Sequence, residues 1–509
     1  MSTISSNNKR IVKNSLVLYI RQFLIMIITL FTSRVILQAL GVEDFGINNV
    51  VAGTVTMFSM FSGFMSAATS RYLNFAMGKG DKDLLYKTFS ASLLIYVIMV
   101  VIIFVFAETV GLWFINNKLV ISESRLAAAN WIFQFSIVSC VNALLATPYN
   151  ASIISHEKMS VYAYVSIIEA VLKLAICYMA LTLPGDRLIV YGFLYMIVSL
   201  IVTMIYRFYC IQNFVECKFH ICKDKTIYKS LISYSIWNLL GTITAFAKGQ
   251  GLNVMLNIFF NPSINAARGI SYQINSTIVN FSNNFYTAVR PQVTKYYAKG
   301  QLNSMYRLVF FSSKMMFCFI FIVSLPIIIE TPYIVNLWLG QLPEKVVPFT
   351  RLIVTISAIN GMSHPLMTTA QATGKVAFYQ SSIAFFTIMI LPISYVLLEL
   401  GYPAESVYIV SLAIEIITLF SRLYSVKRLV DFPVWEYIKQ VFVRSSAVIV
   451  FASIAPVLIY LNTSENVYTV MVVCFVSVLS SAVSIYFIGL NFYERKKITD
   501  LILHKISKK

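Results

Sequence analysis

The sequence predicts an all-α membrane protein with about fourteen transmembrane helices. Of the 509 residues, 58% are hydrophobic and only 12% are charged, which is too apolar for a soluble protein of this length. Apolar runs of twenty or more residues recur along the whole chain, and each is long enough to cross the hydrocarbon core of a bilayer. The runs are continuous rather than alternating, which indicates helices and not the short strands of a barrel.

The apolar runs define the expected helices, and every connection between them is short. We expect helices at 13–40, 45–70, 84–115, 126–152, 160–183, 188–214, 229–260, 264–290, 304–330, 346–371, 376–400, 405–427, 434–461 and 466–490. No connection is long enough to hold a domain outside the membrane. The first apolar run is also too long for the core of a cleaved signal peptide, so none is expected.

The basic residues of the connections predict the orientation. With a cytoplasmic N-terminus, the inner connections and tails hold 27 Lys and Arg residues, and the outer connections hold four. Because positive loops favour the cytoplasmic side, we expect both termini in the cytoplasm. The same bias accounts for most of the net charge of +19. Basic loops suit an anionic inner leaflet of membrane lipids, so no nucleic-acid partner is expected.

The two halves of the chain share a weak internal repeat. A shift of 220 residues aligns AMGKGDKDLLYK with YYAKGQLNSMYR, and a shift of 217 aligns Pro148 with Pro365 and Lys158 with Lys375. Six helices in each half give both halves the same orientation, which is the layout of a two-lobed alternating-access transporter with a substrate cavity between parallel lobes. Proline kinks a helix, so the repeat-related pair Pro148 and Pro365 is the hinge hypothesis.

The repeat also sets the expected domains. An N-lobe with helices 1 to 6 covers residues 1–215, and a C-lobe with helices 7 to 12 covers 216–430. Helices 13 and 14 follow within 431–492, and a basic cytoplasmic tail covers 493–509. One chain holds both lobes, so a monomer is expected.

Nine basic residues lie within the apolar runs, where charge is costly. At the centre of a membrane helix a charge costs about 2.5–3.5 kcal/mol on the insertion scale, so such residues tend to face a wet interior. Only five acidic residues share those depths. Glu169 and Lys173, four residues apart, are expected to pair on one helix face. The nine basic residues are Arg21, Arg34, Lys173, Lys248, Arg268, Arg290, Lys314, Arg351 and Arg444.

Lys248 and Arg268 are the sharpest candidates for binding an anion. Lys248 lies about twelve residues, or ~18 Å, from the outer end of its helix, close to the membrane midplane. Its surroundings, AKGQGLN, contain two glycines that loosen the helix or let a ligand approach. Arg268 lies just inside the adjoining helix, and Lys314 lies near the middle of 304–330.

Arg21 and Arg34 add two cations in the first helix. They are thirteen residues apart, which puts them on nearly opposite faces of a helix, so they do not form one clamp. Arg34, Lys248 and Arg268 come from the starts of the two repeats and would make the presumed cavity cationic. Such a cavity selects anions, and arginine suits phosphate oxygens.

Weaker candidates complete the site. Glu415 lies in the middle of 405–427 and is a possible proton or sodium coupling group, or it neutralises a buried cation. Cys217, His220 and Cys222 have ligand-like spacing without a second half, so neither a metal nor a cofactor is expected. Six polar residues either line the cavity or bond neighbouring helices: Asn48, Asn49, Asn142, Asn253, Gln273 and Asn275.

Two segments resemble the O-antigen and polysaccharide flippases of bacteria, which belong to the multidrug/oligosaccharidyl-lipid/polysaccharide (MOP) exporter superfamily. They are TSRVILQALGVEDFGINNVVAG with the MGKGD turn, and INAARGISYQINSTIVNFSNNFYTAVRPQVTKYYAKG. The basic N-terminal KRIVKN fits as well. The resemblance covers the whole chain through diffuse motifs.

The resemblance implies a specific activity. Such proteins flip an undecaprenyl-pyrophosphate-linked oligosaccharide repeat unit from the cytoplasmic to the periplasmic leaflet of the bacterial inner membrane. Arginines in the first and in the seventh and eighth helices bind the anionic lipid carrier, and Arg21, Arg34, Lys248 and Arg268 occupy matching regions. A polysaccharide polymerase and chain-length proteins are the implied partners. The sequence does not identify the sugars or the coupling ion.

Two other functions compete with this interpretation. A multidrug or organic-cation exporter of the same superfamily commonly carries acidic residues in the first helix of each lobe, whereas 13–40 and 229–260 contain neither Asp nor Glu. A membrane glycan polymerase or ligase usually needs a sizeable outer loop with catalytic groups. The longest outer loop, around TPYIVNLWLGQLPEKVVP, is short, so an enzyme is not expected.

Overall fold

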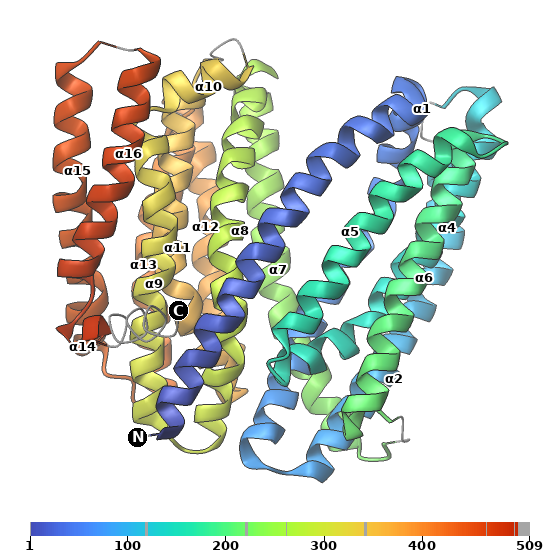
Figure 1. Cartoon of the computed structure of the whole chain (residues 1–509), viewed down its shortest axis with the longest axis horizontal. Coiled ribbons are helices and arrows are strands. Elements are labelled where there is room, and N and C mark those ends of the chain that lie inside the picture. The colour runs from blue at the N-terminus through green and yellow to red at the C-terminus, as the bar shows by residue number, and fades with distance from the viewer. Residues whose placement is uncertain are drawn as a thin grey trace, which may run out of the picture. The chain divides into compact units, whose positions relative to one another are not determined.

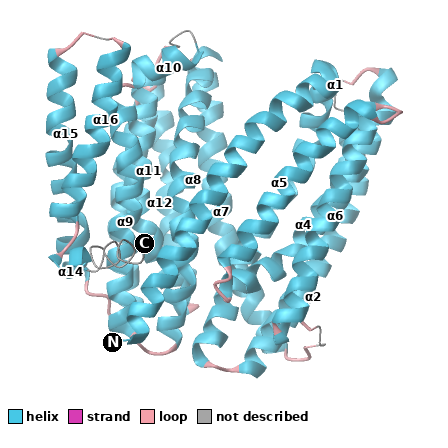
Figure 2. Ribbon diagram, viewed as in Figure 1, coloured by secondary structure: helices cyan, strands magenta, loops and turns pink. Residues whose placement is uncertain are grey.

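The structure, a computed structural model, describes residues 2–117, 121–218, 222–260, 262–339, 344–464, 466–492 and 494–496. The description leaves out the side chains of 2–13, of many positions between 30 and 64, and of several positions in the eighth long helix. Every regular element in the described part is a helix (Figure 2). The prediction of an all-α protein is therefore confirmed.

The chain forms two compact units. The first contains Met1–Leu239 and Thr287–Lys299, and the second contains Leu240–Tyr286 and Gly300–Lys509. Two long helices, α7 (Lys225–Phe259) and α8 (Pro262–Ala298), each belong to both units. The expected lobes, 1–215 and 216–430, stay a prediction about the repeat, because the units divide within α7 and α8.

The first unit begins with α1 (Ser2–Lys79), in which the first two expected helices meet at a kink (Figure 1). Gly41 occupies the kink with φ 78° and ψ 173°, a conformation that costs glycine little because it has no Cβ. The other helices of this unit are α2 (Lys82–Phe106), η1 (Ala107–Gly111), α3 (Leu112–Asn117), α4 (Glu123–Ser155), α5 (Met159–Thr182), α6 (Arg187–Asn213) and η2 (Val215–Cys217).

Close helix packing holds the first unit together. Ile132 and Phe133 of α4 are buried in its core with Tyr191 of α6. A methyl group on Gly192 of α6 would collide with Ile132, and one on Gly111 would lie 2.6 Å from Phe133. Lipid is as apolar as these side chains, so membrane helices associate through such close van der Waals contact, which small residues permit.

The second unit holds the remaining helices. Besides parts of α7 and α8 these are α9 (Leu302–Ile329), α10 (Thr331–Leu339), α11 (Val346–Thr373), α12 (Ala377–Glu399), α13 (Ser406–Val430), α14 (Val434–Tyr437), η3 (Ile438–Val443), α15 (Arg444–Asn462), α16 (Val467–Ser484) and η4 (Ile485–Gly489). Helix α10 lies in the segment that was predicted to be the longest outer loop. It is helical because Val335 is fully buried in the core of this unit, beside Phe349 and Val346.

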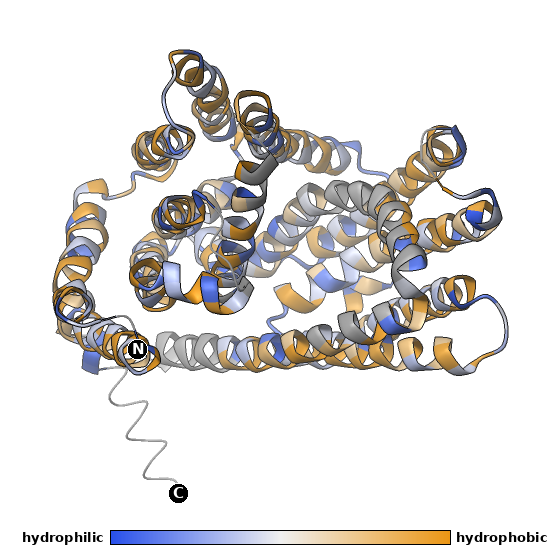
Figure 3. Cartoon of the chain, turned by 90° about the horizontal axis from the view of Figure 1, so that it is seen from above, coloured by the Kyte–Doolittle hydropathy of each residue, from blue (hydrophilic) through white to orange (hydrophobic). Residues whose placement is uncertain are grey.

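All fourteen expected membrane spans fall on described helices, and four of them fall on α1, α7 and α8. Ten helices in the described part are long and apolar enough to cross a membrane. Figure 3 shows hydrophobic residues in orange, with polar ones in blue among them. The repeat is visible in the backbone as well: Gly80 and Gly300, 220 residues apart, have φ of 73° and 70°. The basic tail 493–509 lies outside the described residues except for 494–496.

Candidate functional site

Helix α8 carries a polar face that is unlike a lipid-facing surface. Its exposed residues, among those whose side chains are described, are Gly269, Gln273, Ser276, Thr277 and Asn280. This spacing places all five on one side of the helix. Contact with lipid requires apolar side chains. We name these five residues the polar stripe and infer that it faces water.

Arg268 lies one residue before the polar stripe and joins α8 to α7. Its Nη2 donates a hydrogen bond to the carbonyl oxygen of Gly249 at 2.6 Å, and its Nη1 donates to Oδ1 of Asn253 at 3.3 Å. The guanidinium also stacks over Tyr272, with Cζ 4.5 Å from the ring centroid. Its Nε is buried without a hydrogen-bond partner. Arginine offers five N–H donors, so these bonds leave donors for a ligand.

Lys248 lies on α7, one residue before Gly249, whose carbonyl oxygen accepts the hydrogen bond from Arg268. The two glycines of its segment play different roles: a methyl group on Gly251 would lie 2.6 Å from Leu391 of α12, whereas one on Gly249 would meet open space. Gly251 therefore permits close helix packing, and Gly249 leaves the backbone open to a ligand. Among the described residues, no carboxylate lies within ion-pair distance of Lys248 or Arg268.

Glu415 is the acidic group that acts on Lys248. Its electrostatic attraction for Lys248 is opposed by Arg422, which lies seven residues further along α13. The Arg422 Nη2 lies 3.7 Å from the Glu415 Oε1, and both side chains are largely buried. Arg422 is therefore an ion-pair partner of Glu415, at long distance. Proton or sodium coupling through Glu415 stays a prediction.

Three other predicted cations have different surroundings. Lys314 is buried, and its Nζ lies 2.5 Å from the Glu494 Oε2, so a carboxylate already neutralises it. Arg21 lies over the ring of Tyr162, with Cζ 4.7 Å from the centroid. The side chain of Arg34 lies outside the described residues. Among the predicted cations whose side chains are described, Lys248 and Arg268 are linked through Gly249, the residue after Lys248, which accepts a hydrogen bond from Arg268.

Two further intramembrane cations, Arg351 and Lys173, have partners close by. Arg351 donates from Nε to the carbonyl oxygen of Ile328 at 2.8 Å, at the end of α9, where free carbonyls favour a positive charge. Lys173 Nζ lies 2.6 Å from Glu169 Oε1, as the four-residue spacing predicted.

The predicted hinge residues Pro148 and Pro365 lie inside α4 and α11, and both are buried.

A polar cavity of about 310 Å³ lies in the second unit beside α8. Its polar lining comes from α8 and α11: Asn275, Ser282, Asn283, Ser357, Asn360 and His364. Apolar atoms from Met316 and Ile320 of α9 close one side. Asn275 was a candidate lining residue, whereas the residues of α11 were not. The polar periodicity of α8 was the available signal, but nothing in the sequence indicates which α11 residues it meets.

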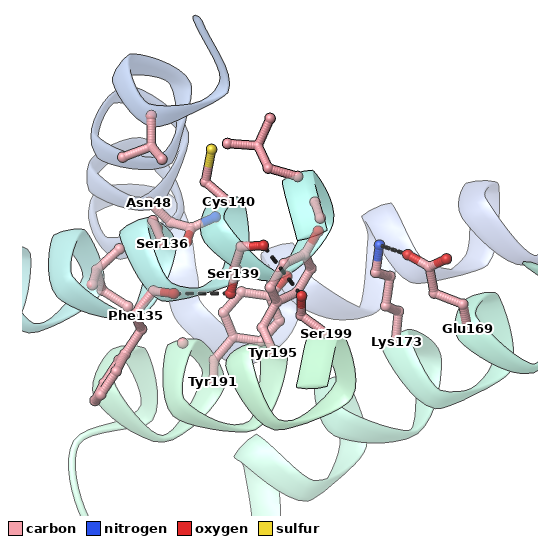
Figure 4. A pocket seen from close by; sticks show the side chains of 15 residues that line it. Asn48, Phe135, Ser136, Ser139, Cys140, Glu169, Lys173, Tyr191, Tyr195 and Ser199 are labelled. Atoms are coloured by element: carbon pink, nitrogen blue, oxygen red, sulfur yellow. Dashed lines mark hydrogen bonds and ion pairs between the residues drawn. The ribbon is translucent and has the colours of Figure 1, made fainter. Parts of the chain in front are cut away.

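A second cavity, of about 390 Å³, lies in the first unit (Figure 4). Lys173 and Glu169 border it from α5, and the Lys173 ammonium also lies 4.9 Å from the ring centroid of Tyr195. Ser139 and Ser199 bond to backbone carbonyls of Phe135 and Ser139, so their hydroxyls serve the helix bundle. Asn48, a predicted lining residue, borders this cavity.

The other candidate residues have structural surroundings. Asn253 accepts from Arg268, Gln273 belongs to the polar stripe, and Asn142 is buried. The side chain of Asn49 and all of His220 lie outside the described residues. His220 was the central member of the candidate metal motif.

The sequence is similar to a known protein family. A family model described as "Polysaccharide biosynthesis protein" matches residues 11–331, which is more than half of the chain. No curated protein matches the sequence.

Solved structures resemble the fold. An outward-facing multidrug resistance MATE family transporter of the MOP superfamily has a TM-score of 0.71 at 12% identity, over 84% of this chain and 97% of that one. A MATE in complex with MaD3S has a TM-score of 0.72 at 12% identity, over 83% and 97%. A MOP superfamily transporter from Pyrococcus furiosus, described as having a binding pocket of reverse polarity, has a TM-score of 0.69 at 12% identity, over 83% and 96%.

Proposed function

Because the chain belongs to the polysaccharide biosynthesis protein family and has the fold of a MOP-superfamily transporter, we propose that it flips lipid-linked oligosaccharides. The substrate is an undecaprenyl-pyrophosphate-linked repeat unit, moved from the cytoplasmic to the periplasmic leaflet for O-antigen or related surface polysaccharide. The observation that carries the proposal is the pair Lys248 and Arg268. Arg268 adjoins the polar stripe of α8, and Lys248 adjoins Gly249, whose carbonyl oxygen accepts from Arg268. No carboxylate of the described chain lies at ion-pair distance from either cation.

This pair suits a pyrophosphate. Carrying that anion through hydrocarbon unaided is prohibitive, because it would lose its hydration without compensation. Arg268 offers unused donors, including Nε, and charge-assisted hydrogen bonds to an oxyanion are about twice as strong as neutral ones. Hydrogen bonds to Gly249 and Asn253 and the Tyr272 ring hold the guanidinium in place. The pyrophosphate therefore meets a preorganised cation.

The polar stripe gives the glycan a wet surface, while the prenyl tail stays in lipid. Alternating access then exposes the site first to one leaflet and then to the other. The basic connections support cytoplasmic termini in the inner membrane. The proposed protein acts as a monomer, and its partners are the lipid-linked substrate and the polymerase and chain-length proteins of assembly.

Complementation tests this function. Surface polysaccharide is measured in a strain lacking the gene and carrying the wild type, Arg268→Ala, Lys248→Ala or Arg268→Lys, each with its membrane level determined. We expect at least a tenfold loss for each alanine variant, because a hydrogen bond to a charged group contributes about 1.5–3 kcal/mol. Arg268→Lys should be intermediate, because lysine keeps the charge without the planar fork of donors.

Lys375→Ala is the matched control. Lys375 is exposed beyond the end of α11, so its removal takes away one positive charge far from the site. Full polysaccharide in all site variants would refute the anion site. A deletion strain with normal polysaccharide but altered sensitivity to cationic drugs would favour the multidrug exporter, whose fold this chain shares.

A further inference from the structure

We propose that the polar cavity beside α8 binds an uncharged sugar of the glycan, the one attached to the pyrophosphate. This inference rests on the proposed function and adds a second subsite to it. The cavity residues are Asn275, Ser282 and Asn283 of α8 with Ser357, Asn360 and His364 of α11. We call them the amide cavity.

The lining of the amide cavity matches a sugar ring chemically. None of its described lining residues is Asp, Glu, Lys or Arg, so the site has neither the cations of a phosphate site nor the carboxylates of a metal site. Three of the six polar residues are asparagines. A carboxamide offers two donors and an acceptor, and a hydroxyl both donates and accepts. Neighbouring hydroxyls of a sugar can therefore pair with both ends of one amide.

One of these amides has an unused acceptor. The Oδ1 of Asn275 is buried and has no hydrogen-bond partner in the structure. Leaving a buried polar atom unpaired costs on the order of 1–3 kcal/mol. A hydroxyl donor from a bound sugar would remove that cost, so the cavity is built to gain from a ligand with hydroxyl groups.

The position of the cavity along α8 fits the linkage. Arg268 and Asn275 are seven residues apart, which is close to two helical turns, so they lie on one face of α8 and about 10 Å apart along its axis. Tyr272 lies between them, and its ring carries the Arg268 guanidinium. A pyrophosphate at Arg268 would direct the attached sugar along this face toward Asn275.

The size and rigidity of the cavity also fit. Its volume of about 310 Å³ is at the small end of the ~300–1,000 Å³ typical of small-molecule sites. His364 is held edge-on by the ring of Tyr286, 5.2 Å between centroids, and the Tyr286 hydroxyl is hydrogen-bonded to the Thr368 Oγ1 at 2.6 Å. The wall that α11 provides is therefore ordered before a ligand arrives.

Binding to the full-length protein in lipid nanodiscs tests the inference. The two probes are undecaprenyl pyrophosphate and undecaprenyl-pyrophosphoryl-N-acetylglucosamine. We expect the wild type to bind the glycolipid about tenfold more tightly than the bare carrier. Asn275→Leu and Asn360→Leu keep the side-chain size but remove its hydrogen bonds, and should bring this ratio close to one without weakening binding of the bare carrier.

Arg268→Ala is the comparison variant, and it should weaken binding of both lipids alike. Retained binding of the bare carrier also reports that each leucine variant is folded, and Ser357→Ala provides a milder change in the same wall. Equal wild-type affinity for the two lipids, or an unchanged ratio in both leucine variants, would overturn the sugar subsite while leaving the proposed function intact. Binding of neither lipid to the wild type would overturn both.

Discussion

Arg125 and Asp186 form an ion pair that the chain builds twice. The Arg125 Nη1 lies 2.5 Å from the Asp186 Oδ2. At positions 220 and 219 residues further on, the Lys345 Nζ lies 2.9 Å from the Glu405 Oε1. In each unit the pair joins the start of one long helix, α4 or α11, to the residue before another, α6 or α13. The two pairs are therefore a structural counterpart of the sequence repeat.

The pair in the first unit is the stronger of the two. Arg125 also bonds Asp44, with its Nε 2.7 Å from the Asp44 Oδ1, close after the kink of α1. We expect Arg125→Ala to lower the free energy of unfolding by about 2–3 kcal/mol, because it breaks hydrogen bonds to two carboxylates. Lys345→Ala, which breaks a single partly exposed pair, should cost less than about 1 kcal/mol. Thermal unfolding of the purified variants measures both, and similar losses would contradict the assignment.

Asp186 predicts how the protein responds to acid. Burial alone would raise the pKa of its carboxyl, but hydrogen bonds from Arg125 and from the backbone N–H groups of Ile189 and Leu188 outweigh burial and hold the pKa below its ordinary value. A carboxyl with a lowered pKa stabilises the fold above its unfolded pKa of about 3.9 and loses that contribution as the pH falls through the folded value.

The pH test compares two proteins. Wild-type stability should fall more steeply below about pH 4 than that of Asp186→Asn, which has no carboxyl to titrate at this position. Melting temperatures are measured from about pH 3 to about pH 7, a range that brackets the unfolded pKa of an aspartate carboxyl. Parallel curves for the two proteins would show that Asp186 contributes nothing to acid sensitivity.

Glu157 forms a buried cluster with the far end of α8, within the first unit. Its carboxylate lies 2.7 Å from the Lys295 Nζ and accepts from the Gln292 Nε2 at 2.6 Å. Only 1% of its side chain is exposed. We expect Glu157→Ala to destabilise the protein by about 3–5 kcal/mol, because it leaves a partly buried ammonium without its counter-ion.

An exposed ion pair is the control for Glu157. Lys87 and Asp83, four residues apart on α2, have side chains that are 41% and 73% exposed, and water and salt screen such surface pairs strongly. Lys87→Ala should therefore hardly change the melting temperature. A Glu157→Ala effect as small as that of Lys87→Ala would mean that the cluster is hydrated and contributes little.

The hinge hypothesis predicts a loss of transport without a loss of folding. Pro148→Ala and Pro365→Ala restore a helical N–H inside α4 and α11 and remove the steric cause of a kink. We expect surface polysaccharide to fall several-fold, with membrane levels and melting temperatures unchanged or raised. Pro392→Ala in α12, outside the repeat-related pair, is the control. Equal loss of membrane protein in both hinge variants would refute the hypothesis.

The helices were predictable because the property that defines them is local. A run of apolar residues must form a helix in lipid, since only its own backbone can satisfy its N–H and C=O groups. The expected bounds 346–371 and 466–490 accordingly lie within a few residues of α11 and of the α16–η4 segment. The short helix α10 was missed because its apolar surface packs on its own unit and its length is far below that of a span.

The charges were predictable only in part. Glu169 and Lys173 share one helix, so their spacing was enough to pair them. Lys314 was a candidate anion ligand from its depth alone, but its partner Glu494 follows 180 residues later, and no spacing rule relates positions so distant. The α11 wall of the amide cavity is also remote from α8 in the sequence, since Asn360 follows Asn275 by 85 positions. The packing of helices that are far apart in the sequence determines which of these side chains meet.

The helical spans, the repeat and the excess of intramembrane cations could be read from the order of residues alone, because hydrophobicity and charge are properties of single residues. Tertiary structure decided which cations keep their charge available. Packing brings Glu494 to Lys314 but leaves Lys248 and Arg268 without a carboxylate at ion-pair distance in the described chain. A charge within the membrane is costly unless a counter-ion or water stabilises it. Folding supplies the counter-ion of Lys314, and under the proposed function the pyrophosphate supplies that of Lys248 and Arg268.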